Sequence, residues 1–276
     1  MAKFGNVSLE EPDVTDSLGR VYIILLFISG IVWGFLAVNN QSNPDIFKIS
    51  LVYSILLILG LLGVGLDRVS DNLGLDSRLW SSKNLGRNLV IALIVSMAWY
   101  LLFLRGGFSV AVPQAVASPL FVVADSVKFF LVTVLGPLAE NLFFFGVVNF
   151  TFILFIRETI QEKNKAWILA MVVMATYLIF NSVPFSLITL SLAAISIIVS
   201  AYSNNKTIQH WGPVFASAFI VGGNVFPIYH SSAYQLNEQN FVAAMIFGIL
   251  MCLLGYFAGM LVVDVVHTFN NVAVMI

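Results

Sequence analysis

The stretch GPLAENLFFFG, residues 136–146, decides both the fold and the search for a function. It places the carboxylate of Glu140 and the amide of Asn141 side by side at the start of a strongly apolar helix. An ionisable side chain at the centre of a membrane costs about 2.5–3.5 kcal/mol even on lenient insertion scales, so such a residue is a functional-site hypothesis by default. Glu140 is therefore the first candidate site residue.

The composition around this stretch predicts an integral membrane protein. Of the 276 residues, 59% are hydrophobic and only 10% are charged, which is more apolar surface than one globular core can bury. We expect membrane lipids as partners and no nucleic acid, because the net charge of −1 comes without a basic cluster. Cys252 is the single cysteine, so neither an intramolecular disulfide nor a cysteine metal cluster can form.

Apolar runs of spanning length predict an all-α fold, a polytopic transmembrane helical bundle. The clear runs are 21–38, 49–66, 88–104, 138–156, 166–180, 185–202 and 211–228. The region 241–276 is long enough for two short helices with a break near 255–259. We therefore expect a polar cytoplasmic tail at 1–20 and one multi-pass membrane domain at 21–276, with about eight or nine spans.

The segment 120–135 decides the topology. Asp125 and Lys128 interrupt it, and the Gly136–Pro137 pair is expected to end it. If the segment is interfacial or re-entrant, ten of the other Lys and Arg residues lie inside and two lie outside; if it crosses, each side holds six. The positive-inside rule favours the topology in which this segment does not cross the membrane and the N-terminus is cytoplasmic.

In this topology His230, His267 and Asn271 lie at about the depth of Glu140, near the outer leaflet. His267 and Asn271 are four residues apart and share a helix face, with Asp264 one turn earlier on that face. Such a polar row must face the bundle interior or a hydrated cavity. A carboxylate base, a histidine that holds water and donors to an oxyanion are the parts needed for metal-free hydrolysis of a peptide bond.

Three segments within 136–276 resemble the motifs of the CAAX protease and bacteriocin-processing family, a family of glutamate intramembrane proteases. Residues 137–146 resemble its first motif, in which two glutamates are followed by three residues and an arginine. Phe226 and His230 match the second motif, and His267 and Asn271 match the third. Each motif is short, but their order and shared depth make the set more specific than any one of them.

The resemblance implies that Glu140 activates water, that His230 positions it and that His267 with Asn271 stabilises the oxyanion. It implies no cofactor and no metal, and a membrane-associated peptide or protein as the substrate. We expect a prokaryotic cell membrane as the location. Asn141 is assigned a supporting role only.

The first motif departs from the family at two positions, because Asn141 stands in place of the second glutamate and Phe145 in place of the arginine. The interval from Glu140 to His230 is also longer than is usual in the family. An alternative is therefore a catalytically degenerate member that serves as a binding, immunity or scaffold subunit beside a partner membrane subunit. A transporter or redox subunit ranks lower, because no compact metal-binding spacing is present.

Each candidate residue also has a structural interpretation. Glu140 follows Pro137 in a first helical turn, where the helix dipole favours a carboxylate. Asn141, or His267 with Asn271, could lock helix packing through interhelical hydrogen bonds. Asp264 could orient His267. These alternatives stay open at the level of the sequence.

Overall fold

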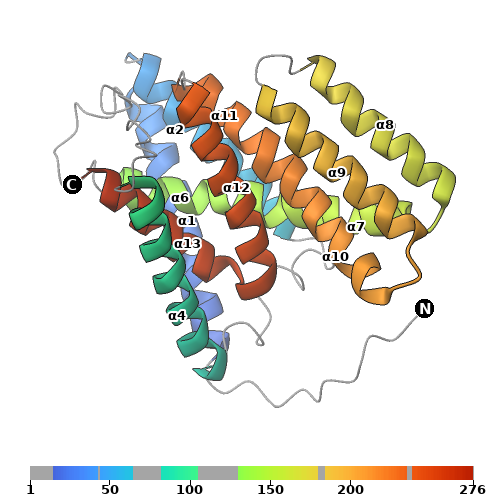
Figure 1. Cartoon of the computed structure of the whole chain (residues 1–276). Coiled ribbons are helices and arrows are strands. Elements are labelled where there is room, and N and C mark those ends of the chain that lie inside the picture. Colours follow the sequence, from blue (N-terminus) through green and yellow to red (C-terminus); the bar gives the residue numbers. More distant parts are fainter. Residues whose placement is uncertain are drawn as a thin grey trace.

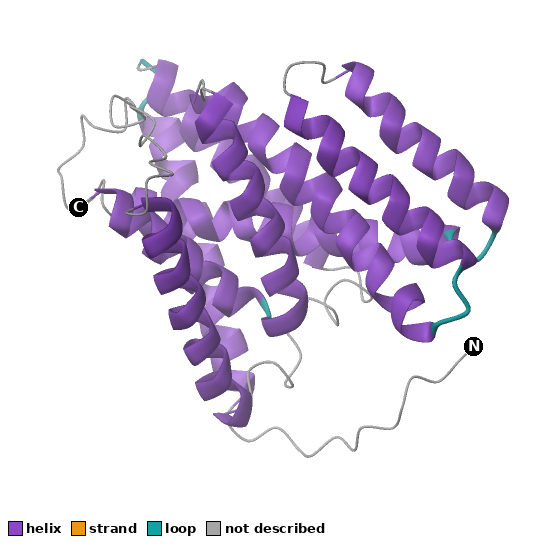
Figure 2. Ribbon diagram, in the orientation of Figure 1, coloured by secondary structure: helices purple, strands orange, loops and turns teal. Residues whose placement is uncertain are grey.

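The computed structural model describes residues 15–42, 44–64, 82–104, 130–179, 184–234 and 238–275. Every regular element in these ranges is a helix and none is a strand, as Figure 2 shows. The predicted all-α fold class is confirmed. Most of the predicted tail at 1–20 and most of the segment 120–135 lie outside the described residues.

The helices follow one another along the chain in three groups. The N-terminal group is α1 (Thr15–Asn39), α2 (Pro44–Val64), α4 (Ser82–Trp99) and the π-helical η1 (Tyr100–Leu104). The central group is η4 (Leu131–Leu135), α6 (Gly136–Glu140), η5 (Asn141–Val148), α7 (Asn149–Thr159), α8 (Lys163–Ile179) and α9 (Pro184–Tyr202). The C-terminal group is α10 (Lys206–Ser217), η6 (Ala218–Val225), α11 (Phe226–Tyr234), α12 (Glu238–Ala258) and α13 (Met260–Met275).

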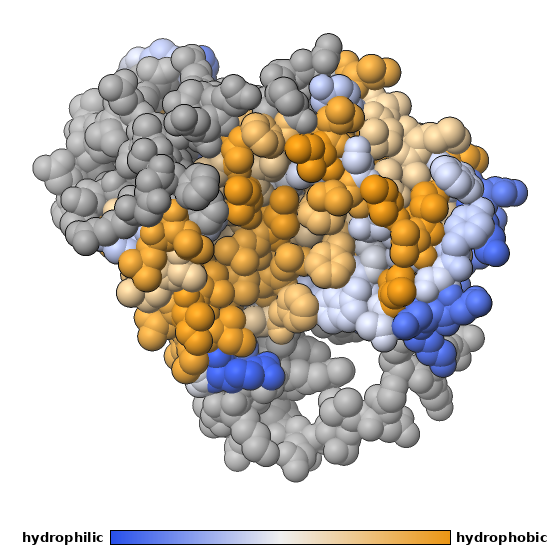
Figure 3. Space-filling model, in the orientation of Figure 1, coloured by the Kyte–Doolittle hydropathy of each residue, from blue (hydrophilic) through white to orange (hydrophobic). Residues whose placement is uncertain are grey.

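Several of these helices have the length and the apolar composition of membrane spans. Five described segments are long and apolar enough to cross a membrane, namely 46–63, 133–159, 185–202, 206–231 and 241–258. Three shorter apolar helices cover 24–39, 86–102 and 260–273. The count of eight or nine spans stays a prediction. Figure 3 shows hydrophobic residues across the middle of the described face and hydrophilic residues mainly at its lower and right edges.

The expectation that Gly136–Pro137 ends a helix is wrong. The helix continues from η4 through α6 and η5 into α7, so that Glu140 lies inside a long helical run. Proline lacks an N–H and crowds the preceding turn, and the wider π-helical turn of η4 accommodates both effects. The carbonyl of Leu135 accepts hydrogen bonds from Ser29 Oγ at 3.3 Å and Trp33 Nε1 at 3.4 Å, which attach this turn to α1.

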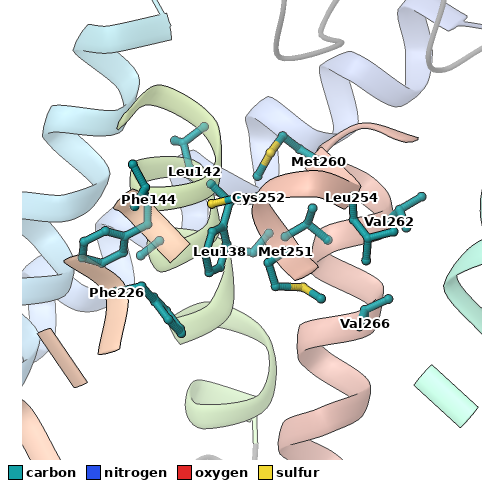
Figure 4. Packing of buried hydrophobic residues seen from close by; sticks show 14 of the residues in the cluster. Leu138, Leu142, Phe144, Phe226, Met251, Cys252, Leu254, Met260, Val262 and Val266 are labelled. Atoms are coloured by element: carbon teal, nitrogen blue, oxygen red, sulfur yellow. The ribbon is translucent and has the colours of Figure 1, made fainter. Parts of the chain in front are cut away.

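Two layers of helices pack around this run (Figure 1). On one side α8, α9 and α10 lie next to one another, and on the other α4 runs along α13. Between them, buried apolar side chains from α6, η5, α11, α12 and α13 form the main core, part of which is shown in Figure 4. The core therefore surrounds the stretch that carries Glu140.

Glycines allow one close approach of two helices and one break between helices. A Cβ atom at Gly222 in η6 would collide with the backbone of Gly248 in α12, so these two helices touch through their backbones. Gly259 has φ of 86°, a left-handed conformation that favours glycine, and it separates α12 from α13. The predicted break near residues 255–259 is confirmed.

Candidate functional site

Glu140 is the last residue of α6, and it is only 3% exposed. Its Oε1 atom accepts a hydrogen bond from the Tyr53 hydroxyl at 3.0 Å and a longer one from the Tyr229 hydroxyl at 3.4 Å. Tyr53 belongs to α2 and Tyr229 to α11, so the two hydroxyls approach from different parts of the chain. One carboxylate oxygen is therefore held, which leaves the other free to face different groups.

Both histidines predicted for the site face that second oxygen. His230 Nε2 lies 3.6 Å from Glu140 Oε2, and His267 Nε2 lies 3.9 Å from the same atom. These separations are too long for direct hydrogen bonds, and a water molecule beside each pair of atoms could contact both of them. The structure thus brings together Glu140, His230 and His267, which are far apart in the sequence.

The partners of the two Nδ1 atoms assign the tautomers. His230 Nδ1 lies 3.2 Å from the carbonyl oxygen of Phe226, which can only accept, so Nδ1 carries the proton. His267 Nδ1 lies 2.7 Å from Asn141 Oδ1, which is also an acceptor. In the neutral state, both histidines therefore present an unprotonated Nε2 towards Glu140.

Asn141 connects His267 to Asp264. Its Nδ2 donates to Asp264 Oδ1 at 2.7 Å while its Oδ1 accepts from His267. All three side chains are buried, with Asn141 at 0% exposure. Asp264 thus orients His267 through the intervening Asn141 amide rather than by direct contact. Because the Asp264 carboxylate accepts and the His267 ring donates, the orientation of the Asn141 amide is fixed.

The local sequence explains how the site forms. Glu140 and His230 each lie three residues after a proline, Pro137 and Pro227, and a π-helical segment precedes each proline. π-Helical turns occur frequently at functional sites because they turn side chains away from the regular helical positions. Asp264 and His267, one turn apart on α13, share the face that meets this region.

Asn271 and Phe145 contact residues outside the centre that Glu140, His230 and His267 form. Asn271 lies one turn beyond His267, where its Oδ1 accepts a hydrogen bond from Asn270 at 3.1 Å. Phe145 is fully buried and packs against Phe226, with ring centroids 4.8 Å apart. An aromatic ring therefore occupies the position at which the family that the motifs resemble has an arginine.

Sequence reasoning missed the two tyrosines. Tyr53 lies 87 positions before Glu140, and no local pattern distinguishes it from other tyrosines in apolar helices. Tyr229 stands next to His230 in the second motif, so its neighbourhood was the only available signal. Both residues contribute by holding Oε1.

His230 is the most accessible member of the centre. Its side chain is 17% exposed, whereas those of Glu140 and His267 are each 4% exposed. The described residues contain no group of three or more His, Cys, Asp or Glu side chains with an arrangement suited to a metal ion.

Comparisons with known proteins leave the family relationship as a prediction from the motifs. No protein-family model, no curated protein and no solved structure matches this chain.

Proposed function

We propose that this protein is a metal-independent intramembrane endopeptidase-like hydrolase that cleaves a membrane-associated peptide or protein. The observation that carries the proposal is the approach of the His230 and His267 Nε2 atoms to one oxygen of a buried glutamate, at 3.6 and 3.9 Å. A buried carboxylate beside the unprotonated Nε2 atom of His230 is a pair of acceptors that can hold and activate a water molecule.

Glu140 and His230 hold the nucleophilic water in this mechanism. Glu140 Oε2 and His230 Nε2 are both acceptors, so one water donates a hydrogen bond to each and keeps its lone pairs free for attack. Glu140 takes a proton as the water oxygen forms a bond to the peptide carbonyl carbon. The same proton then passes to the leaving nitrogen as the carbon–nitrogen bond breaks, and this transfer regenerates the carboxylate.

The oxyanion requires hydrogen-bond donors, and the tautomers constrain which residues supply them. Neutral His267 uses its only N–H towards Asn141, so its Nε2 donates to the oxyanion only in the imidazolium form, with a proton that it takes from solvent before the reaction and keeps throughout. Asn271 is the second donor in this proposal, and its Nδ2 is the atom suited to the role. Tyr53 and Tyr229 keep the carboxylate in position throughout.

The proposed orientation places the N-terminus in the cytoplasm of a prokaryotic cell. It is supported by the basic end of the α8–α10 group, where Lys163 Nζ lies 4.9 Å from the centre of the Tyr202 ring. Trp167 Nε1 donates to the Tyr202 hydroxyl at the same end, at 3.0 Å. Tyr and Trp side chains gather at either membrane interface, and an excess of basic side chains favours the cytoplasmic one.

A second candidate is a non-enzymatic binding, immunity or scaffold subunit that contacts a partner membrane protein. It is favoured by the exclusion of Glu140 from the surface and by the aromatic packing of Phe145. In this alternative the polar chain from Asp264 to Glu140 stabilises helix packing only. A stoichiometric partner recovered from detergent, with Glu140→Gln tolerated in a functional assay, would favour it.

The test is cleavage of fluorogenic transmembrane peptides by the purified protein in lipid nanodiscs. We expect cleavage by the wild type and its loss in both Glu140→Ala and His230→Ala. Glu158→Ala, which changes an exposed glutamate on the same helical run, is the control and should cleave normally. Activity retained by both site variants would overturn the proposal.

A further inference from the structure

A second feature of the molecule is a pocket of about 620 Å³ between α7, α8, α9 and η6. Its volume is within the range of small-molecule sites. Nine of its thirteen lining residues are apolar, and Glu140, His230 and His267 are not among them. The pocket is thus separate from the candidate hydrolytic centre.

The pocket opens on the side of the molecule that meets lipid. Phe155, Ile168 and Val172 contribute to its lining, and each is more than half exposed, at 53%, 57% and 54%. In Figure 1, α8 lies at the outer edge of the helix layers. A molecule dissolved in the bilayer can therefore enter sideways between α7 and α8.

Three of the four polar lining residues have their polar groups engaged within the protein. Thr159 Oγ1 donates to the carbonyl of Phe155 at 2.8 Å, and Thr176 Oγ1 donates to the carbonyl of Val173 at 2.6 Å. Lys165, at the basic end, pairs with Glu162 at 2.6 Å. These groups do not call for a ligand.

Asn224 is the fourth polar lining residue, and it differs from the others. It is 2% exposed, and its Nδ2 donates to Thr189 Oγ1 at 2.9 Å and to the carbonyl of Phe219 at 2.8 Å. Its Oδ1 is buried and has no hydrogen-bond partner among the described residues. The amide cannot be reversed, because the Phe219 carbonyl needs a donor. An unsatisfied buried acceptor is costly, so a ligand donor at this position is favoured.

We propose that the pocket binds a single-chain lipid alcohol whose hydroxyl donates to Asn224 Oδ1. The lining of α8 from Lys165 to Thr176 is about 16 Å long at 1.5 Å per residue, which accommodates an extended alkyl chain. A hydrocarbon without a donor would leave Asn224 Oδ1 unpaired. A ligand with a large polar head would find no further unsatisfied partner in the lining. This proposal does not depend on the proposed hydrolysis.

The experiment uses a diazirine-bearing dodecanol as a photolabel for the full-length protein in phosphatidylcholine nanodiscs. This lipid carries no hydroxyl or N–H group, so the bilayer supplies no competing donor. We expect adducts on α7 and α8, and we expect dodecanol to compete with the label about tenfold better than its methyl ether, in which a methyl group replaces the hydroxyl hydrogen. Equal competition by the alcohol and the ether would overturn the proposal.

Variants test separately whether the alcohol donates to Asn224 and whether it occupies the pocket. Asn224→Leu should be labelled but should no longer distinguish the alcohol from the ether. The control Asn39→Leu makes the same change at an exposed residue outside the lining, and it should distinguish them as the wild type does. Val172→Trp and Ile168→Trp fill the pocket from positions that face lipid, so both should lose labelling at an unchanged unfolding temperature. Labelling that persists unchanged in both tryptophan variants would place the alcohol elsewhere and contradict the site.

Discussion

His267 Nδ1 lies 2.7 Å from Asn141 Oδ1, and this contact determines which ring nitrogen of His267 meets Glu140. The Asn141 amide is in turn fixed by Asp264, which accepts its Nδ2 hydrogen at 2.7 Å. A residue that stands in place of a glutamate in the resembling family thus has a defined position here. It links an acidic residue to the histidine through two hydrogen bonds.

Asn141→Leu should destabilise the protein by about 2–3 kcal/mol, because it leaves Asp264 and His267 Nδ1 buried without this partner. The measurement is thermal unfolding in detergent, together with peptide cleavage, which should fall sharply as the His267 ring loses its orientation. Asn39→Leu is the control, since Asn39 is exposed and bonds only the carbonyl of its own helix at Phe35. Equal stability of the two variants would show that the polar chain contributes little.

Tyr53→Phe should lower the cleavage rate about tenfold, because Glu140 loses a hydrogen bond to Oε1 that is 3.0 Å long. Tyr229→Phe should have a smaller effect, since its contact is 3.4 Å long. Single-turnover rates measure both, and Tyr202→Phe near the other end of the bundle is the control. A larger loss in Tyr229→Phe than in Tyr53→Phe would reverse the assigned order of the two hydroxyls.

The helices and the residues of the centre were accessible from the sequence to different degrees. Apolar runs gave the all-α class because a helix is the simplest way to satisfy backbone groups in lipid. Polar residues in such runs singled out Glu140, His230 and His267 because each is costly there. The contact between Glu140 and Tyr53 could not be predicted, since it depends on how α2 packs against α6.

Local geometry explains the remaining differences from the sequence prediction. Pro137 was expected to end a helix, but the π-helical turn before it accommodates the ring and the missing N–H. Asn271 was placed with His267 by helical periodicity alone. Periodicity gives the shared face but not the rotamer, and the hydrogen bond from Asn270 sets the position of the Asn271 oxygen.

Gly222→Ala should lower the free energy of unfolding by about 1–3 kcal/mol, because the added Cβ collides with the Gly248 backbone and forces η6 away from α12. Gly34→Ala is the matched control. A Cβ at Gly34 meets no atom within 4 Å, so this helix-favouring change should be neutral or slightly stabilising. Thermal unfolding of both variants in the same detergent checks the difference, and a Gly222→Ala protein as stable as wild type would contradict the backbone contact.

Treatment with a strong chelator should leave the cleavage rate unchanged, because the proposed mechanism uses a carboxylate base rather than a metal-bound hydroxide. Cleavage is measured before and after dialysis, with metal analysis of the same samples. Loss of activity that a divalent ion restores would instead assign Glu140, His230 and His267 as metal ligands. That outcome would show a metal-dependent hydrolysis and overturn the metal-independent mechanism.

The most direct measurement of the central claim is the single-turnover cleavage rate of Glu140→Gln in nanodiscs. Glutamine keeps the shape of the side chain and can still accept from Tyr53, but it cannot take a proton from water. We expect a loss of about 10²–10⁴-fold, with unchanged unfolding temperature and substrate binding. A rate within threefold of wild type would show that Glu140 is not the catalytic base.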